Sequence, residues 1–490
     1  MGQAEARNRG SNQSRKFFEM KGFHQAASSD EKELILATEA ILNSALAAVD
    51  PAVLINQSLK REGTRLEIMG KERSEVIDLE SFRRVFLIAL GKASPLMAGA
   101  FLKLLGDRIY KGIVVCQPGV EFFWPGVERL EAPHPLPDER SLKVAEKIIE
   151  LSQETGETDL VFFLISGGAS AQMAMPVNPV TLADKAKVTK ALMEAGSDIR
   201  ELNIVRKHLS EVKGGRLGRF FGQATIINLF ISDVIDDDLE TIASGLTTWD
   251  SSTYSEAKKI IEKYNLWDTV PESIKEVMEK GVRGEIRETR KKDEVIQTRL
   301  FNFIIGHIEV AIEAATQRAR ELGFCPIILS RRETGEARER ARLWAGLVRS
   351  LHLSFPLDSK PLALISGGEL TVTVRGKGRG GRNLEFCLAL LKELMEDPLP
   401  ENFNWCAASL ATDGRDGPTE AAGAIISPLV IKKVMEAGLD PALYLNNNDS
   451  LSFFEKTGSL IVTGPTGTNV MDLRLFLLKK RKEFARPESD

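Results

Sequence analysis

The sequence predicts an α/β protein with two domains. Continuous apolar runs at 85–90, 160–165 and 224–231 each end in small or polar residues. Between these runs lie segments of helix length with charged faces, such as 141–153 and 181–195. Buried strands that alternate with amphipathic helices are typical of a mostly parallel sheet covered on both faces. We therefore expect an N-terminal α/β/α domain, with helices on both faces of a parallel sheet.

The first domain is expected to span residues 31–285, after a polar tail at 1–30. A helical apolar rhythm over 31–60 begins the domain. The tail mixes basic and acidic residues without an apolar core, which is typical neither of a signal peptide nor of a transit peptide. Residues 275–292 are dense in charge and short of large apolar side chains, so we place the domain boundary within 271–300.

The second, smaller domain is expected over 295–485, with a mixed sheet. Strands are predicted at 301–306, 325–329, 361–365 and 405–410, and helices at 309–322, 336–351 and 384–395. The alternating segment 370–374 predicts a half-exposed, antiparallel strand. Leu-Ile-Ser-Gly-Gly occurs at 164–168 and again at 364–368, which indicates the same kind of glycine turn at a strand end in each domain.

Length and charge exclude several classes of protein. A chain of 490 residues exceeds the size of one hydrophobic core. Lys and Arg total 65 against 69 Asp and Glu, a formal charge of −4 that provides no field for gripping nucleic acid or anionic lipid. The 4 cysteines form no CxxC pair, and no apolar run approaches the roughly 18 residues of a membrane helix. We expect a cytoplasmic protein with neither nucleic acid nor a membrane as partner.

The glycine-rich loops at strand ends are candidates for anion binding, because ligands bind at the carboxyl ends of the strands in open α/β sheets. Gly91-Lys92 follows the first apolar run, and Ser166-Gly-Gly-Ala-Ser170 has the composition of an anion nest, although a tight turn with a serine cap explains it equally well. Cations and a glycine pair at 206–216 modestly favour a phosphate site over a solvated helix face.

Two aspartates also follow strand ends. Asp233 comes after the run 224–231, and Asp413 comes after the strand predicted at 405–410. Carboxylates in such places could bind magnesium or act as a general base. Helix capping is the competing explanation for the run Asp236–Asp238.

The loop 375–383 contains a GxGxxG pattern formed by Gly376, Gly378 and Gly381. A dinucleotide fingerprint needs a buried strand before it and an acidic residue about 20 positions later, and both are missing here. The loop's four cations fit polyphosphate better. An RGG-like RNA-binding segment is the other interpretation, but such segments are long and disordered, whereas this one is flanked by core elements.

Seven motifs in order carry a family resemblance from about residue 34 to 478: ALGKAS, LISGGASA, NIVRKHLSEVKGGRL, ISDVIDDDLETIASG, ISGGELTVTVRGKGRGGRNLE, ATDGRDGPTEAAGA and TGPTGTNVMDL. The sequence resembles the glycerate 2-kinases whose C-terminal part is called the MOFRL domain. The resemblance implies ATP-dependent phosphorylation of D-glycerate to 2-phosphoglycerate with Mg²⁺, in a cleft between a Rossmann-like N-terminal domain and a smaller C-terminal domain. A monomer or homodimer is expected.

The resemblance also transfers two site residues, the lysine of GKA and the arginine of GGRN. These are Lys92, expected to bind the transferring phosphate, and Arg382, expected to grip the substrate carboxylate or the charge of the transition state. Asp233 and Asp413 are the candidates for magnesium ligand or base. Candidates for nucleotide binding are Gly91, Ser166, Gly167, Gly168, Ser170, Lys213, Gly214, Gly215, Gly378, Gly380 and Gly381. Candidates for substrate binding are Arg206, Asn383, Glu369 and Asp416.

The sequence departs from the family pattern at four positions beside these expected loops. Leu246 replaces a usual proline, His307-Ile308 replaces Ser-Asn, and Leu384 replaces glutamine. Two other functions remain open on the sequence: an NAD(P)H-dependent hydroxypyruvate reductase, and a catalytically inactive relative that binds nucleotide or RNA.

Overall fold

The computed structural model describes residues 16–20, 27–294, 299–354 and 360–481, which form two compact units. Unit 1 comprises residues up to Val49 together with 309–466 and the chain from Asp472 onward, and unit 2 comprises 50–308 together with 467–471. Most of the expected polar tail, at 1–15 and 21–26, lies outside the described residues.

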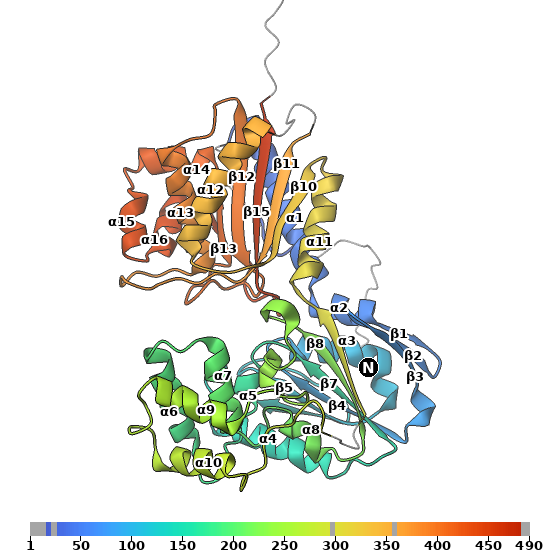
Figure 1. Ribbon diagram of the computed structural model, residues 1–490. Coiled ribbons are helices and arrows are strands. Elements are labelled where there is room, and N and C mark those ends of the chain that lie inside the picture. Colours follow the sequence, from blue (N-terminus) through green and yellow to red (C-terminus); the bar gives the residue numbers. More distant parts are fainter. Residues whose placement is uncertain (1–15, 21–26, 295–298, 355–359, 482–490) are drawn as a thin grey trace, which may run out of the picture. The chain divides into compact units, whose positions relative to one another are not determined.

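Unit 2 is built on a six-stranded, entirely parallel sheet (Figure 1). Its order is β6-β5-β4-β7-β8-β9. The strands are β4 (Arg84–Leu90), β5 (Ile109–Cys116), β6 (Val127–Glu131), β7 (Asp159–Ile165), β8 (Thr225–Ile231) and β9 (Leu300–Gly306). The chain moves outward from β4 in one direction through β5 and β6, and then returns to β7 and moves in the other. The strand order therefore reverses between β4 and β7, where open α/β sheets bind their ligands.

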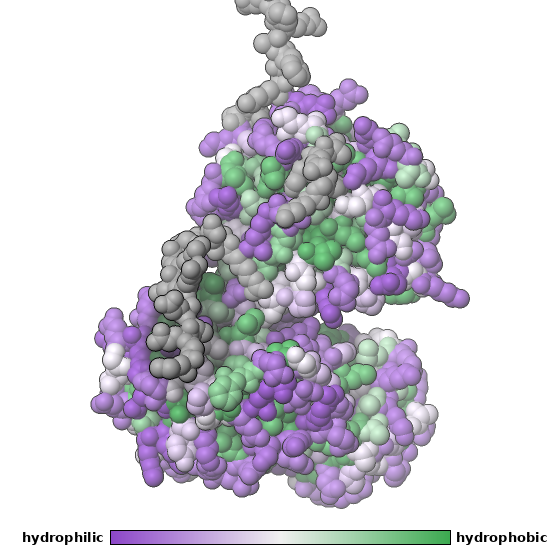
Figure 2. Space-filling view, turned by 180° about the vertical axis from the view of Figure 1, so that it is seen from behind, coloured by the Kyte–Doolittle hydropathy of each residue, from purple (hydrophilic) through white to green (hydrophobic). Residues whose placement is uncertain are grey.

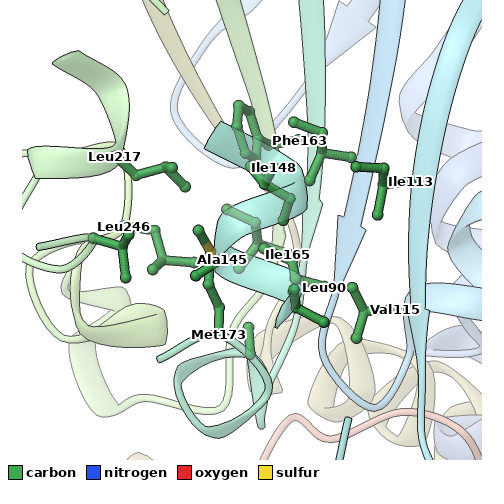
Figure 3. Packing of buried hydrophobic residues seen from close by; sticks show 14 of the residues in the cluster. Leu90, Ile113, Val115, Ala145, Ile148, Phe163, Ile165, Met173, Leu217 and Leu246 are labelled. Atoms are coloured by element: carbon green, nitrogen blue, oxygen red, sulfur yellow. The ribbon is translucent and has the colours of Figure 1, made fainter. Parts of the chain in front are cut away.

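Helices cover both faces of this sheet, as the sequence predicts. Helices α2 (Pro51–Ser58) and α3 (Ser94–Leu105) lie on one face, where Phe101 packs against Phe162. Helix α4 (Glu139–Ser152) and the short α8 (Arg216–Phe220) lie on the other, with Ala145 and Ile148 of α4 over Phe163 (Figure 3). Successive residues of a strand point to opposite faces, so the continuous apolar runs reflect burial on both sides.

Four more helices of unit 2 form a small bundle around their own apolar cluster. They are α6 (Leu182–Glu194), α7 (Ile199–His208), α9 (Tyr254–Lys263) and α10 (Glu272–Val282). Ile274, Val277 and Met278 of α10 are buried in this cluster. The charged segment where we expected the domain boundary therefore lies inside unit 2, and its first part, 275–282, belongs to α10.

Unit 2 also contains short elements that the sequence analysis did not predict. A three-stranded antiparallel sheet is formed by β1 (Leu59–Glu62), β2 (Arg65–Met69) and β3 (Ser74–Asp78). A single helical turn, α5 (Ala169–Gln172), follows β7.

Unit 1 has the expected mixed sheet, in the order β10-β11-β15-β12-β13-β14. Only β10 and β11 pair in parallel. The strands are β10 (Cys325–Glu333), β11 (Leu362–Gly368), β12 (Phe403–Ala411), β13 (Gly423–Ile426), β14 (Leu460–Ile461) and β15 (Asp472–Lys480). The helices are α1 (Ser29–Ala48), α11 (Ile308–Glu321), α12 (Ala337–Ser354), α13 (Arg382–Glu396), α14 (Pro428–Glu436), α15 (Pro441–Asn446) and α16 (Ser450–Thr457). Helices α1 and α13 lie on opposite sides of the sheet (Figure 1).

The compact units divide the chain differently from the expected domain ranges. Helix α1, expected in the N-terminal domain, packs on β12 and β15 of unit 1. Phe18 and Met20, within the expected tail, are buried in unit 1, and their N–H groups donate to Asn43 and Glu39. Strand β9, expected in the second domain, pairs with β8 instead, because the parallel sheet of unit 2 takes it as an edge strand.

Two local predictions in unit 1 are wrong. Residues 370–374 form no strand, and Thr371 makes one isolated bridge to Glu336. The N–H of Thr373 donates to the side-chain carboxylate of Glu336, so a side chain takes the place of a strand partner. The second Leu-Ile-Ser-Gly-Gly, at 364–368, lies inside β11 and is paired with β15, so it is not a turn at a strand end.

Hydrophilic side chains are spread over the described surface in the face that Figure 2 shows, with apolar ones between them. Within the described ranges no single helix is long and apolar enough to cross a membrane, although α1 and α2 taken together, as a bent pair, pass that test of length and composition.

Candidate active site

Lys92 lies where the strand order of unit 2 reverses, in the turn between β4 and α3. Its backbone N–H donates to Gly167 O at 2.8 Å, across to the turn that follows β7. The N–H of Ala93 donates to Ser166 Oγ at 3.0 Å. Gly91 has a φ of +108°, and a Cβ there would lie 2.3 Å from Ser166 Oγ. The two turns are thus bonded to each other, which fixes the start of the Lys92 side chain.

The glycine turn after β7, residues 166–168, is surrounded by ionisable side chains. A Cβ on Gly167 would lie 2.1 Å from Asp233 Oδ2, and one on Gly168 would lie 3.0 Å from His134 Cδ2 and 3.3 Å from Lys92 Cγ. Within the described part of the chain, the N–H groups of Gly167 and Gly168 have no protein acceptor. A cation, a carboxylate, an imidazole and two available N–H donors therefore meet at this turn.

Two residues of this site were not selected from the sequence. His134 follows β6, in a proline-rich loop that marks it only as rigid. Asn469, in the 467–471 segment that belongs to unit 2, donates from Nδ2 to Asp233 Oδ2 at 3.2 Å. No local pattern could indicate Asn469, because 236 residues separate it from its partner.

Asp237 and Asp238, in the acidic run after Asp233, make local contacts, although neither is the N-cap of a helix. Asp237 pairs with Lys71 at 2.9 Å. Asp238 accepts hydrogen bonds from Glu240 N–H at 3.1 Å and from Thr241 Oγ1 at 2.6 Å. Asp233 remains the carboxylate of this run that faces the glycine turn.

A cluster of cations and hydroxyls lies beside α5, and we call Ser170, Arg206, Lys213 and Ser244 the cation cluster. Lys213 Nζ donates to both Oγ and O of Ser170, each at 2.6 Å. Ser244 Oγ lies 2.8 Å and Arg206 Nη2 lies 3.5 Å from the same Ser170 Oγ. Arg206 comes from α7 and Ser244 from the 3₁₀ helix Ile242–Ser244, so three separate elements converge on one serine.

The positive charge of this cluster is not balanced by acidic groups. Burial lowers the pKa of Lys213 well below its ordinary value, and repulsion from Lys185 and Arg206 lowers it further. Burial also lowers the pKa of Arg206 and, more strongly, that of Lys185. None of these three cations is paired with a carboxylate in the part of the chain that the structure describes.

Gly214 and Gly215 shape the chain around Lys213. Both have positive φ, +59° and +76°, and their N–H groups donate to Ser244 O at 3.0 Å and to Gly245 O at 2.5 Å. These donors are therefore already used inside the protein. The pair positions Lys213 and has no N–H group to offer to a nucleotide phosphate.

Arg382, in unit 1, begins α13 and is held by two carboxylates. Its Nε and Nη2 donate to Asp472 at 2.5 and 3.0 Å, and Nη1 lies 2.6 Å from Glu369 Oε1. Burial alone would lower the pKa of Arg382, but these carboxylates outweigh it and raise that pKa. The guanidinium is thus fixed in orientation, and its charge is largely compensated. Glu369, a candidate for substrate binding, is one of the groups that hold it.

Asp416 and Asn383 have structural contacts in place of the expected substrate contacts. Asp416 is 1% exposed and accepts from Asn383 N at 3.0 Å and Leu384 N at 2.8 Å, so it caps α13. Burial raises the pKa of Asp416 to about 6, against the effect of these N–H groups. The Asn383 side chain bonds Asp416 and Ser409.

The glycine loop 375–381 is held by a second loop of unit 1. Gly376 N and Gly378 N donate to Asn448 Oδ1 and Asn447 O at 3.0 and 2.8 Å. The N–H groups of Gly380 and Gly381 have no protein acceptor within the described ranges. Only this last part of the GxGxxG pattern could bind an anion, which agrees with the argument against a dinucleotide fingerprint.

Asp413 forms a local turn in unit 1, whereas Asp233 belongs to unit 2. Asp413 Oδ1 accepts from Arg415 N at 3.0 Å, and its carbonyl oxygen accepts from Thr466 N at 3.3 Å. Among the described residues there is no group of three or more His, Cys, Asp or Glu side chains that could hold a metal ion.

The four departures from the family pattern are buried. Leu246, Ile308 and Leu384 are 2%, 4% and 0% exposed, and His307 is 8% exposed. Leu246 packs in the apolar cluster under α4 (Figure 3). These positions are therefore part of the packing of each unit.

At the switch point of the parallel sheet, glycine turns lie beside cations and a carboxylate. These features are typical of an α/β protein that binds anionic ligands. A family described as a domain of unknown function, DUF4147, matches residues 37–279, and the MOFRL family matches residues 362–472. The chain belongs to the glycerate kinase family that combines these two regions.

Individual relatives agree with this assignment. The glycerate 2-kinase of Pyrococcus horikoshii is 35% identical, over 90% of this chain and 97% of its own. The crystal structure of glycerate kinase from Thermotoga maritima matches with a TM-score of 0.77 at 36% identity, covering 91% of this chain and 99% of that one. A protein of Agrobacterium vitis with the provisional name hydroxypyruvate reductase is 39% identical, over 89% and 93% of the two chains.

Proposed function

We propose that the protein transfers the γ-phosphoryl group of ATP to the 2-hydroxyl of D-glycerate. The observation that carries this proposal is Lys92 at the switch point, bonded through its backbone to a glycine turn with two available N–H donors. Relatives that are named glycerate 2-kinases match this chain over nearly their whole length, and this supports the choice of substrate. Phosphoryl transfer depends mainly on positioning and on neutralising charge, which is what such a turn supplies.

Lys92 and the glycine turn act on the phosphate. The Lys92 ammonium is a compact positive charge, and the N–H groups of Gly167 and Gly168 are fixed dipoles that need no reorganisation during the reaction. Together they bind the transferring group and stabilise the negative charge on its oxygens.

Asp233 is the group of unit 2 that can accept the proton of the substrate hydroxyl or bind Mg²⁺. Asn469 fixes one of its carboxylate oxygens. Magnesium in kinases is usually bound by one or two carboxylates, with phosphates and waters completing the shell. Asp233 fits as such a single ligand, and the ion would supply charge neutralisation between the phosphates. Asp413 is the corresponding candidate in unit 1.

Arg382 acts as an oriented cation in unit 1. Asp472 grips it through two nitrogens and Glu369 through the third, so little rotational freedom is lost when a ligand binds. Because these carboxylates balance its charge, Arg382 is suited to a group of spread negative charge, such as a phosphate, and the available N–H groups of Gly380 and Gly381 precede it in the chain.

The second candidate is a hydroxypyruvate reductase, which the name of the Agrobacterium vitis relative favours. The geometry does not support it. The first turn of the parallel sheet reads Gly91-Lys92-Ala93-Ser94 and lacks the second and third glycines that bring a dinucleotide pyrophosphate close to the backbone.

Two assays on one sample separate these candidates. Release of ADP is measured with ATP, Mg²⁺ and a panel of small hydroxy acids, and oxidation of NADH and NADPH is measured with hydroxypyruvate. We expect ADP release that depends on D-glycerate and no oxidation of either cofactor. Oxidation with hydroxypyruvate and no ADP release would reverse the assignment.

A further inference from the structure

The cation cluster carries more positive charge than its surroundings balance. Lys213 is 1% exposed, and Lys185, whose charge acts on it, is 8% exposed. A buried charge costs several kcal/mol unless a partner of opposite sign compensates it. No carboxylate does so here among the described residues, and the depressed pKa of each lysine reflects that cost. Such an arrangement is stable in the charged form when an external anion completes it.

The donors of the cluster converge on one point. Lys213 Nζ, Arg206 Nη2 and Ser244 Oγ all lie within 3.5 Å of Ser170 Oγ. A planar guanidinium, an ammonium and two hydroxyls match the two oxygens of a carboxylate. Ser170 and Arg206 are half-buried and form the exposed side of the cluster, whereas Lys213 and Ser244 are buried.

The cluster is adjacent to the phosphate turn. Ser170 follows Gly168 by two residues, at the start of α5, and the Lys92 side chain lies against Gly168. In a 2-hydroxy acid the carboxylate is bonded to the carbon that bears the reacting hydroxyl. An acid bound by its carboxylate at Ser170 therefore presents its hydroxyl toward the group that Lys92 binds.

Arg382 is a poorer candidate for the carboxylate. Its guanidinium already has the two oxygens of Asp472 and one oxygen of Glu369 as acceptors. A substrate carboxylate would have to compete with these two carboxylates of the protein itself. Arg206 donates to the side-chain oxygen of Asn203 at 3.3 Å and lies 3.5 Å from the hydroxyl of Ser170, and no carboxylate pairs with it among the residues that the structure describes.

We propose that Ser170, Arg206, Lys213 and Ser244 form the binding site for the carboxylate of the substrate hydroxy acid. The identity of that acid as D-glycerate rests on the proposed function. The site itself requires only a small carboxylate and would equally take hydroxypyruvate.

The test measures binding without turnover. Dissociation constants of D-glycerate, hydroxypyruvate, glycerol and ADP are measured by calorimetry for the wild type and for Arg206→Met and Lys213→Met. Arg200→Met is the matched control, because Arg200 is an exposed arginine on the same helix. Thermal melting reports whether each variant is folded.

We expect the wild type to bind at least one of the two carboxylates and to bind glycerol, which lacks the carboxylate, at least tenfold more weakly. Arg206→Met and Lys213→Met should each lower the affinity for the carboxylate ligand at least tenfold and change the affinity for ADP less than twofold. Arg200→Met should change neither affinity. Melting temperatures of the two cluster variants should not fall, because an uncompensated cation has been removed.

Three results would overturn the proposal. The first is that the wild type binds glycerol as tightly as it binds the carboxylates, and the second is that it binds neither carboxylate. The third is that a folded Arg206→Met protein binds the carboxylate within twofold of the wild-type affinity. If Lys213→Met fails to fold, the lysine is structural and the proposal is contradicted for that residue, while Arg206→Met still decides the site.

This outcome is separable from the outcome for the proposed function. Loss of hydroxypyruvate binding in Arg206→Met, with no ADP release from the wild type, would keep the carboxylate site and reject the kinase. ADP release with D-glycerate and an unchanged KM for it in Arg206→Met would keep the kinase and reject the site.

Discussion

Lys92 and Arg382, the two cations that we propose act on the phosphate, are held in two different ways. The backbone of Lys92 is fixed by bonds between two turns, while its side chain extends past Gly168. The guanidinium of Arg382 is fixed directly by Asp472 and Glu369. In the first arrangement the protein fixes the backbone of the cation, and in the second it fixes the charged group itself.

Replacing either cation should affect the reaction more than the fold. We expect Lys92→Ala and Arg382→Ala each to lower turnover at least about tenfold, or more than about 1.4 kcal/mol of transition-state stabilisation. Steady-state kinetics with thermal melting measures this. Lys103→Ala, at an exposed lysine of α3, is the control and should be neutral. Near-normal turnover in both variants would contradict the assignment.

Asp416 should make stability depend on pH. Its pKa is raised to about 6 in the folded protein, against about 3.9 for an unperturbed aspartate. A raised carboxyl pKa contributes stability that is fully present below about pH 4 and is lost as pH rises through about 6. Wild-type stability should therefore fall relative to Asp416→Asn between pH 4 and pH 7, by up to about 3 kcal/mol. Parallel melting curves of the two proteins across this range would show that Asp416 does not titrate there.

At the scale of elements, the site depends on turns at the ends of β4, β7 and β8. The parallel pairing of these strands brings their carboxyl ends to one edge. Gly167 has no side chain, and this allows the Asp233 carboxylate to lie against its Cα. The close contact between Asp233, after β8, and the turn after β7 therefore requires glycine at position 167.

Gly167→Ala should displace the Asp233 carboxylate while leaving the backbone unstrained, since Gly167 is not among the positive-φ residues and the added Cβ would meet a side-chain end. We expect turnover to fall at least about tenfold with little change in melting temperature. Gly99→Ala on α3 places the same methyl group in open space and is the control. Full activity in Gly167→Ala would mean that the position of Asp233 is not important for the reaction.

The sequence could predict the elements because burial and periodicity are local. The runs at 85–90, 160–165 and 224–231 are strands within a residue of the expected bounds, and the fold class is confirmed. What failed depended on distant partners. Residues 370–374 alternate like a strand, but they form only an isolated bridge between Thr371 and Glu336. Helix α1 packs on β12 and β15, which lie more than 350 residues later in the chain.

The candidate site was predictable to the same extent. Strand-end position identified Lys92, Gly167, Gly168 and Asp233, because the edge where ligands bind follows from the parallel sheet. The structural roles of Gly214, Asp416 and Asn383 could not be predicted. The sequence does not show whether a given N–H or carboxylate group is already hydrogen-bonded within the protein. The contact between Asn469 and Asp233 depends on the fold alone.

At the scale of the molecule, the two units draw on non-contiguous parts of the chain. Unit 1 takes its first helix from before unit 2, and unit 2 takes residues 467–471 from within the C-terminal region. Leu34, Ile35, Ile41 and Leu42 of α1 are completely buried. Burying a leucine or isoleucine stabilises a fold by about 1.5–3 kcal/mol, so α1 is an integral part of unit 1.

A chain that begins at Asp50 should therefore lose unit 1 selectively. Limited proteolysis should rapidly digest 309–466 while a fragment within 50–308 resists. A chain that begins at Arg15 keeps Phe18, Met20 and α1 and should resist like the full protein. Equal resistance of both units after removal of residues 1–49 would show that α1 is dispensable for unit 1.

The most direct test of the central claim is the position of phosphorylation. The protein is incubated with ATP, Mg²⁺ and D-glycerate, and the product is examined by coupled ¹H and ³¹P NMR. We predict that the phosphorus couples to the single proton on C2, which identifies 2-phosphoglycerate. Coupling to the two protons on C3, or no phosphorylated acid at all, would contradict the account.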